Sequence, residues 1–167
     1  MDHRSLRWVR RRLRSLVWLE LLNVPFQAVI WFGLVGVPVT MINVVGFALL
    51  ALMLVEGAGY WAAKLRQVTR QGSRLQGAGA FAVARRVNPV LLAAGLLLAG
   101  WAGAAVPGTR TWPGLVFATV AMLEHINYFH VQLMYDTAVD LRYLRTRGLR
   151  RAHLARDLND HAKHRGT

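Results

Sequence analysis

The stretch richest in groups that could do chemistry spans residues 123–136 and reads LEHINYFHVQLMYD. It places a carboxylate, two imidazoles and two amides inside a segment that is otherwise apolar enough to cross a membrane. A charged side chain at the bilayer centre costs at least about 2.5–3.5 kcal/mol, so such residues face a protein interior and mark candidate functional sites. The candidates in this stretch are Glu124, His125, Asn127, Tyr128, His130 and Gln132.

Two other apolar segments carry polar residues at helical spacing. They are Glu20, Asn23 and Gln27 in the first, and Glu56 and Tyr60 in the second. Each set lies on one helix face, and the rise of about 1.5 Å per residue brings all three polar stripes into the same half of a membrane. We therefore expect one polar cavity in the cytoplasmic half, with Glu56 and Glu124 as its central charges.

Such a cavity fits three kinds of function. Neighbouring desolvated carboxylates can each carry a proton or bind a cation, so proton or cation handling, as transport or binding, is the working hypothesis. The first alternative is a non-catalytic scaffold or partner subunit, whose polar cluster holds the helices together by hydrogen bonds. The second is a metal-dependent or acid/base membrane enzyme acting on a lipid-like substrate.

Metal and cofactor chemistry stays open. Glu56, Glu124 and His130 are candidate metal ligands by type. On a regular helix His125 and His130 point about 140° apart, so they could share one ion only if the helix unwound. Bis-histidine haem would require a dimer, and the sequence assigns no cofactor.

A second acidic pair follows at the expected membrane interface. Asp136 and Asp140 share a helix face and could hold magnesium. They could equally pair with Arg142 and Arg145, which follow closely in the sequence.

The composition indicates an integral membrane protein. The chain has 167 residues, 54% of them hydrophobic, and the apolar residues fall in long runs. There is no cysteine, which excludes disulfides, zinc–thiolate sites and iron–sulfur clusters. The frequent Arg and Ala suggest a bacterial source.

The net charge of +13 raises the question of nucleic acid, and its distribution answers it. Of the 21 Lys and Arg residues, six lie in residues 1–14, six in 64–86 and eight in 142–165. The basic clusters alternate with apolar runs, as the positive-inside rule expects, and they lack the interleaved aromatic residues of a nucleic-acid platform. We therefore expect no specific nucleic-acid partner, and instead contact between the basic face and anionic lipid.

We predict an all-α, polytopic protein of the bacterial inner (cytoplasmic) membrane. Its four-helix bundle has both termini in the cytoplasm. The predicted segments are a basic N-terminal segment over 1–15, spans at about 16–37, 41–63, 90–106 and 113–135 within a membrane domain over 16–135, a basic cytoplasmic loop over 64–89, and a cytoplasmic extension of the fourth helix with a basic tail over 136–167.

The third predicted span carries small residues instead of a polar stripe. Gly95, Ala99 and Gly103 stand at i, i+4 and i+8, which lets two helix backbones approach closely. The pattern predicts a packing seam, either within the chain or between chains. A homo-oligomer or a protein partner is therefore open.

Overall fold

The computed structural model describes residues 3–70, 75–133, 142, 145 and 149–163. Its elements are α1 (His3–Ala28), the π-helical turn η1 (Val29–Leu34), α2 (Met41–Arg70), α3 (Ala78–Ala105), α4 (Trp112–Phe129) and α6 (His153–Lys163). Apart from an isolated bridge between Val131 and Arg151, the described residues contain no β-structure. The all-α prediction is confirmed for this part of the chain.

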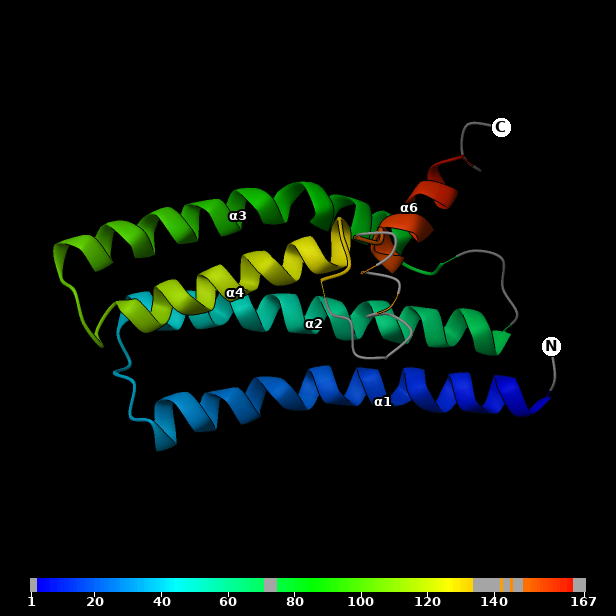
Figure 1. Cartoon of the computed structure of the whole chain (residues 1–167), viewed down its shortest axis with the longest axis horizontal. Coiled ribbons are helices and arrows are strands. Elements are labelled where there is room, and N and C mark those ends of the chain that lie inside the picture. The colour runs from blue at the N-terminus through cyan, green and yellow to red at the C-terminus, as the bar shows by residue number, and fades with distance from the viewer. Residues whose placement is uncertain (1–2, 71–74, 134–141, 143–144, 146–148, 164–167) are drawn as a thin grey trace.

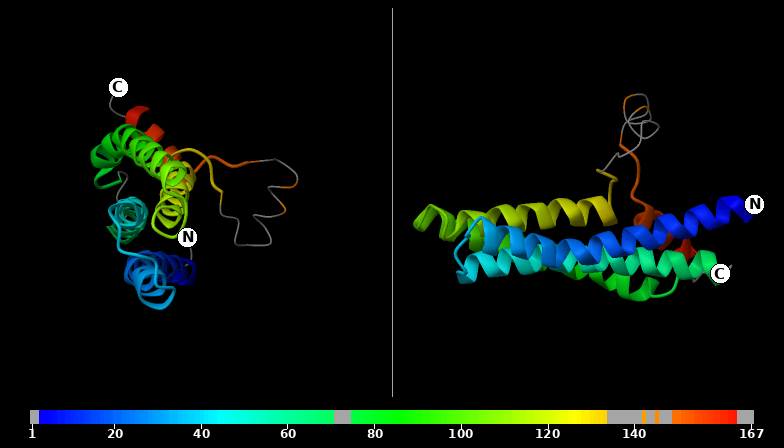
Figure 2. Two further views of the ribbon diagram at one scale, coloured as in Figure 1. Left: turned by 90° about the vertical axis from the view of Figure 1, so that its left-hand side faces the viewer. Right: turned by 90° about the horizontal axis from the view of Figure 1, so that it is seen from below.

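The helices α1 to α4 run alternately in opposite directions and lie side by side (Figure 1). The left-hand view of Figure 2, which looks along the bundle, shows α2 beside α1, α3 and α4. One end of the bundle, here called the basic end, holds the start of α1, the end of α2, the start of α3, and α6. The other, here called the turn end, holds the connections over 35–40 and 106–111.

Three helical segments are long and apolar enough to cross a membrane. They are Leu6–Leu34, Met41–Arg70 and Ala78–Ala105. This finding supports a membrane protein with transmembrane helices. The 18-residue helix α4 is not among them, because Glu124, His125 and Asn127 interrupt its apolar sequence. Membrane crossing by α4 stays a prediction.

Several helices are longer than the predicted spans. Helix α1 begins within the predicted N-terminal segment, α2 continues to Arg70, and α3 begins at Ala78 instead of about residue 90. The predicted loop over 64–89 is therefore mostly helical. Hydropathy locates the apolar part of a helix, whereas Lys, Arg, Gln and Ala continue the helix beyond it because they are good helix formers.

The predicted end of the fourth helix is wrong, because α4 ends at Phe129 and not near residue 135. Beyond it, the Gln132 backbone N–H donates to the Arg150 carbonyl over 2.8 Å, and the Ala152 N–H donates to the His130 carbonyl over 3.1 Å. Pairing with a later segment therefore replaces helical hydrogen bonds. Residues 134–141, with Asp136 and Asp140, lie outside the described residues, as do residues 143–144 and 146–148 of the predicted extension.

At the turn end, α2 and α4 meet backbone to backbone. A Cβ atom added at Gly46 would collide with the Gly114 carbonyl oxygen, and one added at Gly114 would collide with the Ile42 carbonyl oxygen. Beside this contact the fully buried Asn43 donates to the carbonyls of Pro38 over 2.9 Å and Thr109 over 3.0 Å. It also accepts the Gly114 N–H over 2.8 Å. One side chain thus ties α2 to both turn-end connections and to α4.

The predicted seam of small residues on α3 is confirmed as a packing face within the chain. Gly95, Ala99 and Gly103 are all buried. A Cβ at Gly95 would collide with Leu49 of α2, and one at Gly103 would lie 3.4 Å from the Trp112 ring of α4. The seam therefore lets α3 approach two neighbouring helices.

Helix α6 packs onto the basic end of the bundle. Leu154 and Leu158 are buried in a cluster with Tyr60 of α2, Ala78 of α3 and Phe129 of α4. The predicted basic tail therefore contains a helix whose apolar face packs against the bundle.

Candidate functional site

Tyr128 crosses from α4 to α1 through a space left by a glycine of α2. Its hydroxyl donates to Glu20 Oε1 over 2.8 Å, and its side chain is only 8% exposed. A Cβ added at Gly57 would lie 2.5 Å from the Tyr128 hydroxyl oxygen. The absence of a side chain at Gly57 is therefore what allows this contact between α1 and α4.

Glu124 belongs to the same group, here called the Glu20–Tyr128 cluster and comprising Glu20, Glu124, Asn127 and Tyr128. The charge of Glu124 is close enough to act on both Glu20 and Tyr128. The Asn127 amide donates to Glu124 Oε2 over 3.3 Å. Its oxygen accepts the Leu133 N–H over 2.8 Å, so Asn127 also anchors the backbone that follows α4.

The groups that donate hydrogen bonds to the carboxylates of this cluster, the Tyr128 hydroxyl and the Asn127 amide, are neutral. In the part of the chain that the structure describes, no Lys, Arg or His lies within ion-pair distance of Glu20, Glu56 or Glu124. A carboxylate in an apolar segment without a cationic partner is stabilised by holding a proton or a bound cation. The cluster can do either, with Tyr128 bridging the helices.

Glu56 lies in a different contact. Its Oε2 accepts a 2.7 Å hydrogen bond from the amide of Asn88, a residue of α3 that is 3% exposed. No described contact joins Glu56 to Glu124. The contacts therefore divide the predicted cavity into separate groups. The described cavities, of about 350 and 360 Å³, are lined by other residues.

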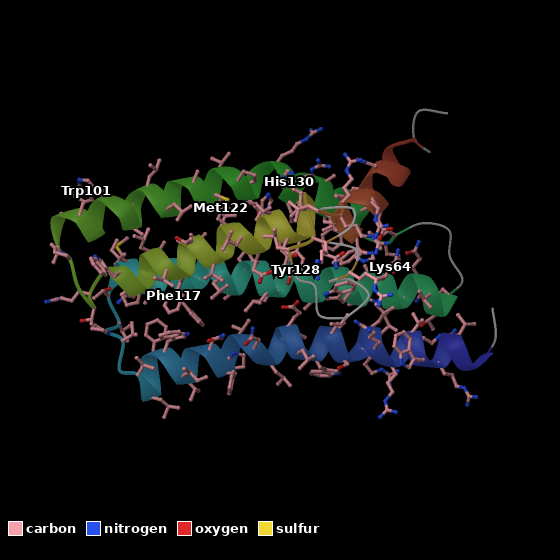
Figure 3. The ribbon with its side chains drawn as sticks, in the orientation of Figure 1. Lys64, Trp101, Phe117, Met122, Tyr128 and His130 are labelled. Atoms are coloured by element: carbon pink, nitrogen blue, oxygen red, sulfur yellow. The ribbon has the colours of Figure 1, made fainter. Side chains whose placement is uncertain are left out.

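A third polar group joins α2 to α6. The Tyr60 hydroxyl donates to Asp157 Oδ2 over 2.9 Å, and Lys64 Nζ lies 2.8 and 3.0 Å from the two carboxylate oxygens. The Lys64 and Asp157 side chains are 28% and 22% exposed. Lys64 lies near α6 in Figure 3. This group holds the C-terminal helix against the bundle.

His125 and His130 come close to each other because α4 ends between them. Their ring centroids lie 5.6 Å apart, and His125 also stacks on Phe129 at 4.7 Å. His125 is 2% exposed, and neither of its ring nitrogens has a hydrogen-bond partner among the described residues. Among the described residues, no three His, Cys, Asp or Glu side chains are grouped to hold a metal ion. The predicted ligands Glu56, Glu124 and His130 are not brought together there.

The remaining candidates lie apart from these groups. Gln27 accepts a 2.9 Å hydrogen bond from the Trp31 indole, one turn along the same helical segment. Asn23 is half-buried on α1. The Gln132 side chain is half-buried beyond the end of α4. None of these three residues contacts Glu20 in a described hydrogen bond.

No protein-family model matches this sequence, and no curated protein or solved structure matches it either.

Sequence reasoning missed three polar residues that the structure places at contacts. Asn43, Asn88 and Asp157 each bond a distant segment. For Asn43 and Asn88 the available signal was an amide at the edge of an apolar run. For Asp157 nothing in the spacing identified the partner.

Substitution of Asp157 by Ala is expected to release α6. The change removes the acceptor of the Tyr60 hydroxyl and the carboxylate that pairs with Lys64. Because this pair is partly exposed, the free energy that holds α6 against the bundle should fall by about 1–2 kcal/mol. Hydrogen exchange in α6 should accelerate while α2 to α4 stay protected. Asn159→Ala, at a half-buried position on the same helix, is the control. Unchanged protection in Asp157→Ala would contradict this role.

The docking of α6 is also expected to weaken in acid. Partial burial lowers the pKa of His153, and the positive charges of Arg156 and Arg150 lower it further, although the residue as a whole remains exposed. Its Nδ1 accepts a 2.9 Å hydrogen bond from Arg156, which a protonated ring could not accept. The unfolded chain therefore binds the proton first as the pH falls through about 6.5.

Thermal unfolding at about pH 7.5 and about pH 5.5, on either side of the ordinary histidine pKa, measures this effect. His153→Gln should reduce the loss of stability at the lower pH and change little at the higher pH. An equal loss in both proteins would exclude His153 as its source.

Proposed function

We propose that this chain is a four-span protein of the bacterial inner membrane whose Glu20–Tyr128 cluster handles protons or cations. The observation that carries the proposal is the pair of carboxylates on α1 and α4, which have neutral donors and no cationic partner among the described residues. Each can take up a proton or a cation within a largely apolar environment. In this proposal Glu56, which accepts a hydrogen bond from Asn88, has a structural role.

The proposed topology places the basic end in the cytoplasm. The basic residues of α1, of the α2–α3 region and of α6 lie at that end, whereas the turn end carries Arg110. This asymmetry supports cytoplasmic termini and four crossings, α4 included. Because the chain has no cysteine, single cysteines report topology cleanly. Thr109→Cys should react with an impermeant reagent from outside, and Gln76→Cys only after permeabilisation. The reverse pattern would overturn the orientation.

Proton uptake by the cluster is tested in two ways. Infrared spectroscopy of the purified protein should show a protonated carboxyl band that titrates with pH, and Glu20→Gln/Glu124→Gln should remove most of it. In vesicles with a pH-sensitive dye, any proton or cation flux should fall to the level of protein-free vesicles in the same variant.

Glu56→Gln is the matched control, because it removes a carboxylate of similar burial while its amide oxygen can still accept from Asn88. It should retain both the flux and most of the titrating band. If Glu20→Gln/Glu124→Gln leaves both signals intact, the cluster is a structural hydrogen-bond group. If Glu56→Gln removes them equally, the assignment to Glu20 and Glu124 is wrong.

A further inference from the structure

One face of α1 lies outside the bundle from Trp8 to Phe26, and its residues are polar at one end and apolar at the other. At the basic end, Trp8, Arg11, Arg12 and Ser15 line a hollow of about 360 Å³. The Arg12 guanidinium lies 5.5 Å from the centroid of the Trp8 ring. The hollow thus combines two guanidinium groups, a hydroxyl and an indole, all of which can donate hydrogen bonds.

The same face continues as an apolar track. Its residues and their exposures are Trp18 (57%), Leu19 (62%), Leu22 (58%) and Phe26 (62%). At about 100° per residue, the hollow and this track occupy one stripe roughly 120° wide. Glu20 and the buried Leu13 lie on the opposite side of the helix, toward the bundle. The stripe therefore faces the surroundings of the bundle from end to end.

We propose that this stripe binds one anionic phospholipid of the cytoplasmic leaflet. The headgroup phosphate sits in the hollow between Arg11 and Arg12, and an acyl chain lies along Trp18, Leu22 and Phe26. The site depends on α1 crossing the membrane and is independent of proton handling at Glu20.

Length and chemistry both support this occupant. From Arg11 to Phe26 the helix rises about 22 Å, close to half of a bilayer about 40–45 Å thick with its headgroups. Arginine matches phosphate oxygens with paired hydrogen bonds, and Trp8 lies where aromatic residues gather at membrane interfaces. Each basic residue near an anionic surface contributes about 1 kcal/mol, which favours anionic over zwitterionic lipid.

Native mass spectrometry of the detergent-purified full chain tests the site, with phosphatidylglycerol and phosphatidylcholine as probes. The wild type should bind one phosphatidylglycerol at least about tenfold more tightly than phosphatidylcholine. Arg11→Gln/Arg12→Gln should lose roughly tenfold or more in that affinity. The matched control is Arg66→Gln/Arg70→Gln, which removes the same charge from exposed positions of α2 at the same end and should keep the preference.

Two further measurements distinguish binding of the whole lipid from binding of its headgroup alone. Leu22→Ala/Phe26→Ala should weaken phosphatidylglycerol binding, and soluble glycerol phosphate should compete poorly. Glycerol phosphate binding as tight as the lipid would make the hollow a simple anion site. Equal losses in the two arginine double variants, or no lipid preference in the wild type, would overturn the proposal. All these positions are exposed, and melting curves will confirm that each variant is folded.

Discussion

Substitution of Gly46 by Ala is expected to destabilise the protein by about 3 kcal/mol, at the upper end of the range for overpacking. The added methyl group would collide with the Gly114 carbonyl oxygen, which belongs to the backbone of α4. A flexible side chain could turn away, but a helix backbone can only move as a unit. Separation of α2 from α4 would also disturb the Asn43 hydrogen bond to the Gly114 N–H.

Gly100→Ala is the matched control for this prediction. Gly100 is also helical, and a Cβ there would lie within 4 Å of no described neighbour. Replacement of a helical glycine by alanine in open space stabilises by about 0.5–1 kcal/mol. The midpoint of thermal unfolding in detergent, measured by circular dichroism, should therefore fall for Gly46→Ala and rise for Gly100→Ala. A Gly46→Ala protein as stable as Gly100→Ala would mean that α2 and α4 shift apart at little cost.

The small-residue seam of α3 could be predicted from the sequence, whereas the contact between Gly46 and Gly114 could not. The seam on α3 repeats along one helix, so its spacing alone indicated close packing. Gly46 and Gly114 are single glycines on different helices, and nothing in the local pattern pairs them. Their contact depends on the register of α2 against α4, which tertiary packing sets.

For the candidate site, the sequence predicted which residues take part but not which residues they contact. The acids of the apolar segments and Tyr128 were identified by type, since polar groups in apolar runs are costly. Their partners were not, because adjacent positions on a helix point about 100° apart. Gly57 faces Tyr128, while the neighbouring Glu56 contacts Asn88. The residue types in one apolar segment therefore did not identify which helix each residue contacts.

The end of α4 and the position of α6 were beyond sequence reasoning for a different reason. Regular periodicity predicts that a helix continues unless Gly or Pro stops it. Here the segment around Arg150 supplies alternative backbone partners to residues 130–132. Long-range pairing of this kind leaves no local signature, and it also brings the His125 and His130 rings together.

Substitution of Asn43 by Ala is expected to cost about 3 kcal/mol, because it strands several buried polar groups at once. The carbonyls of Pro38 and Thr109 would lose their donor, and the Gly114 N–H would lose its acceptor. An unsatisfied buried group costs about 1–3 kcal/mol. Water at the turn end can replace some of these bonds for the carbonyls, but the bond of the Gly114 N–H is buried, and the Gly114 backbone lies against Gly46 in the tight contact between α2 and α4.

Thr119→Ala is the matched control, since Thr119 is exposed and its hydroxyl donates over 2.8 Å to the Leu115 carbonyl of its own helix, with no other hydrogen bond to the described residues. It should change stability by no more than about 0.5 kcal/mol. Asn43→Asp separates the contributions, because it keeps an acceptor for Gly114 while removing both donations. If Asn43→Ala unfolds at the temperature of Thr119→Ala, water satisfies all three groups. If Asn43→Ala and Gly46→Ala combined cost less than their sum, the amide and the glycine stabilise one shared contact between α2 and α4.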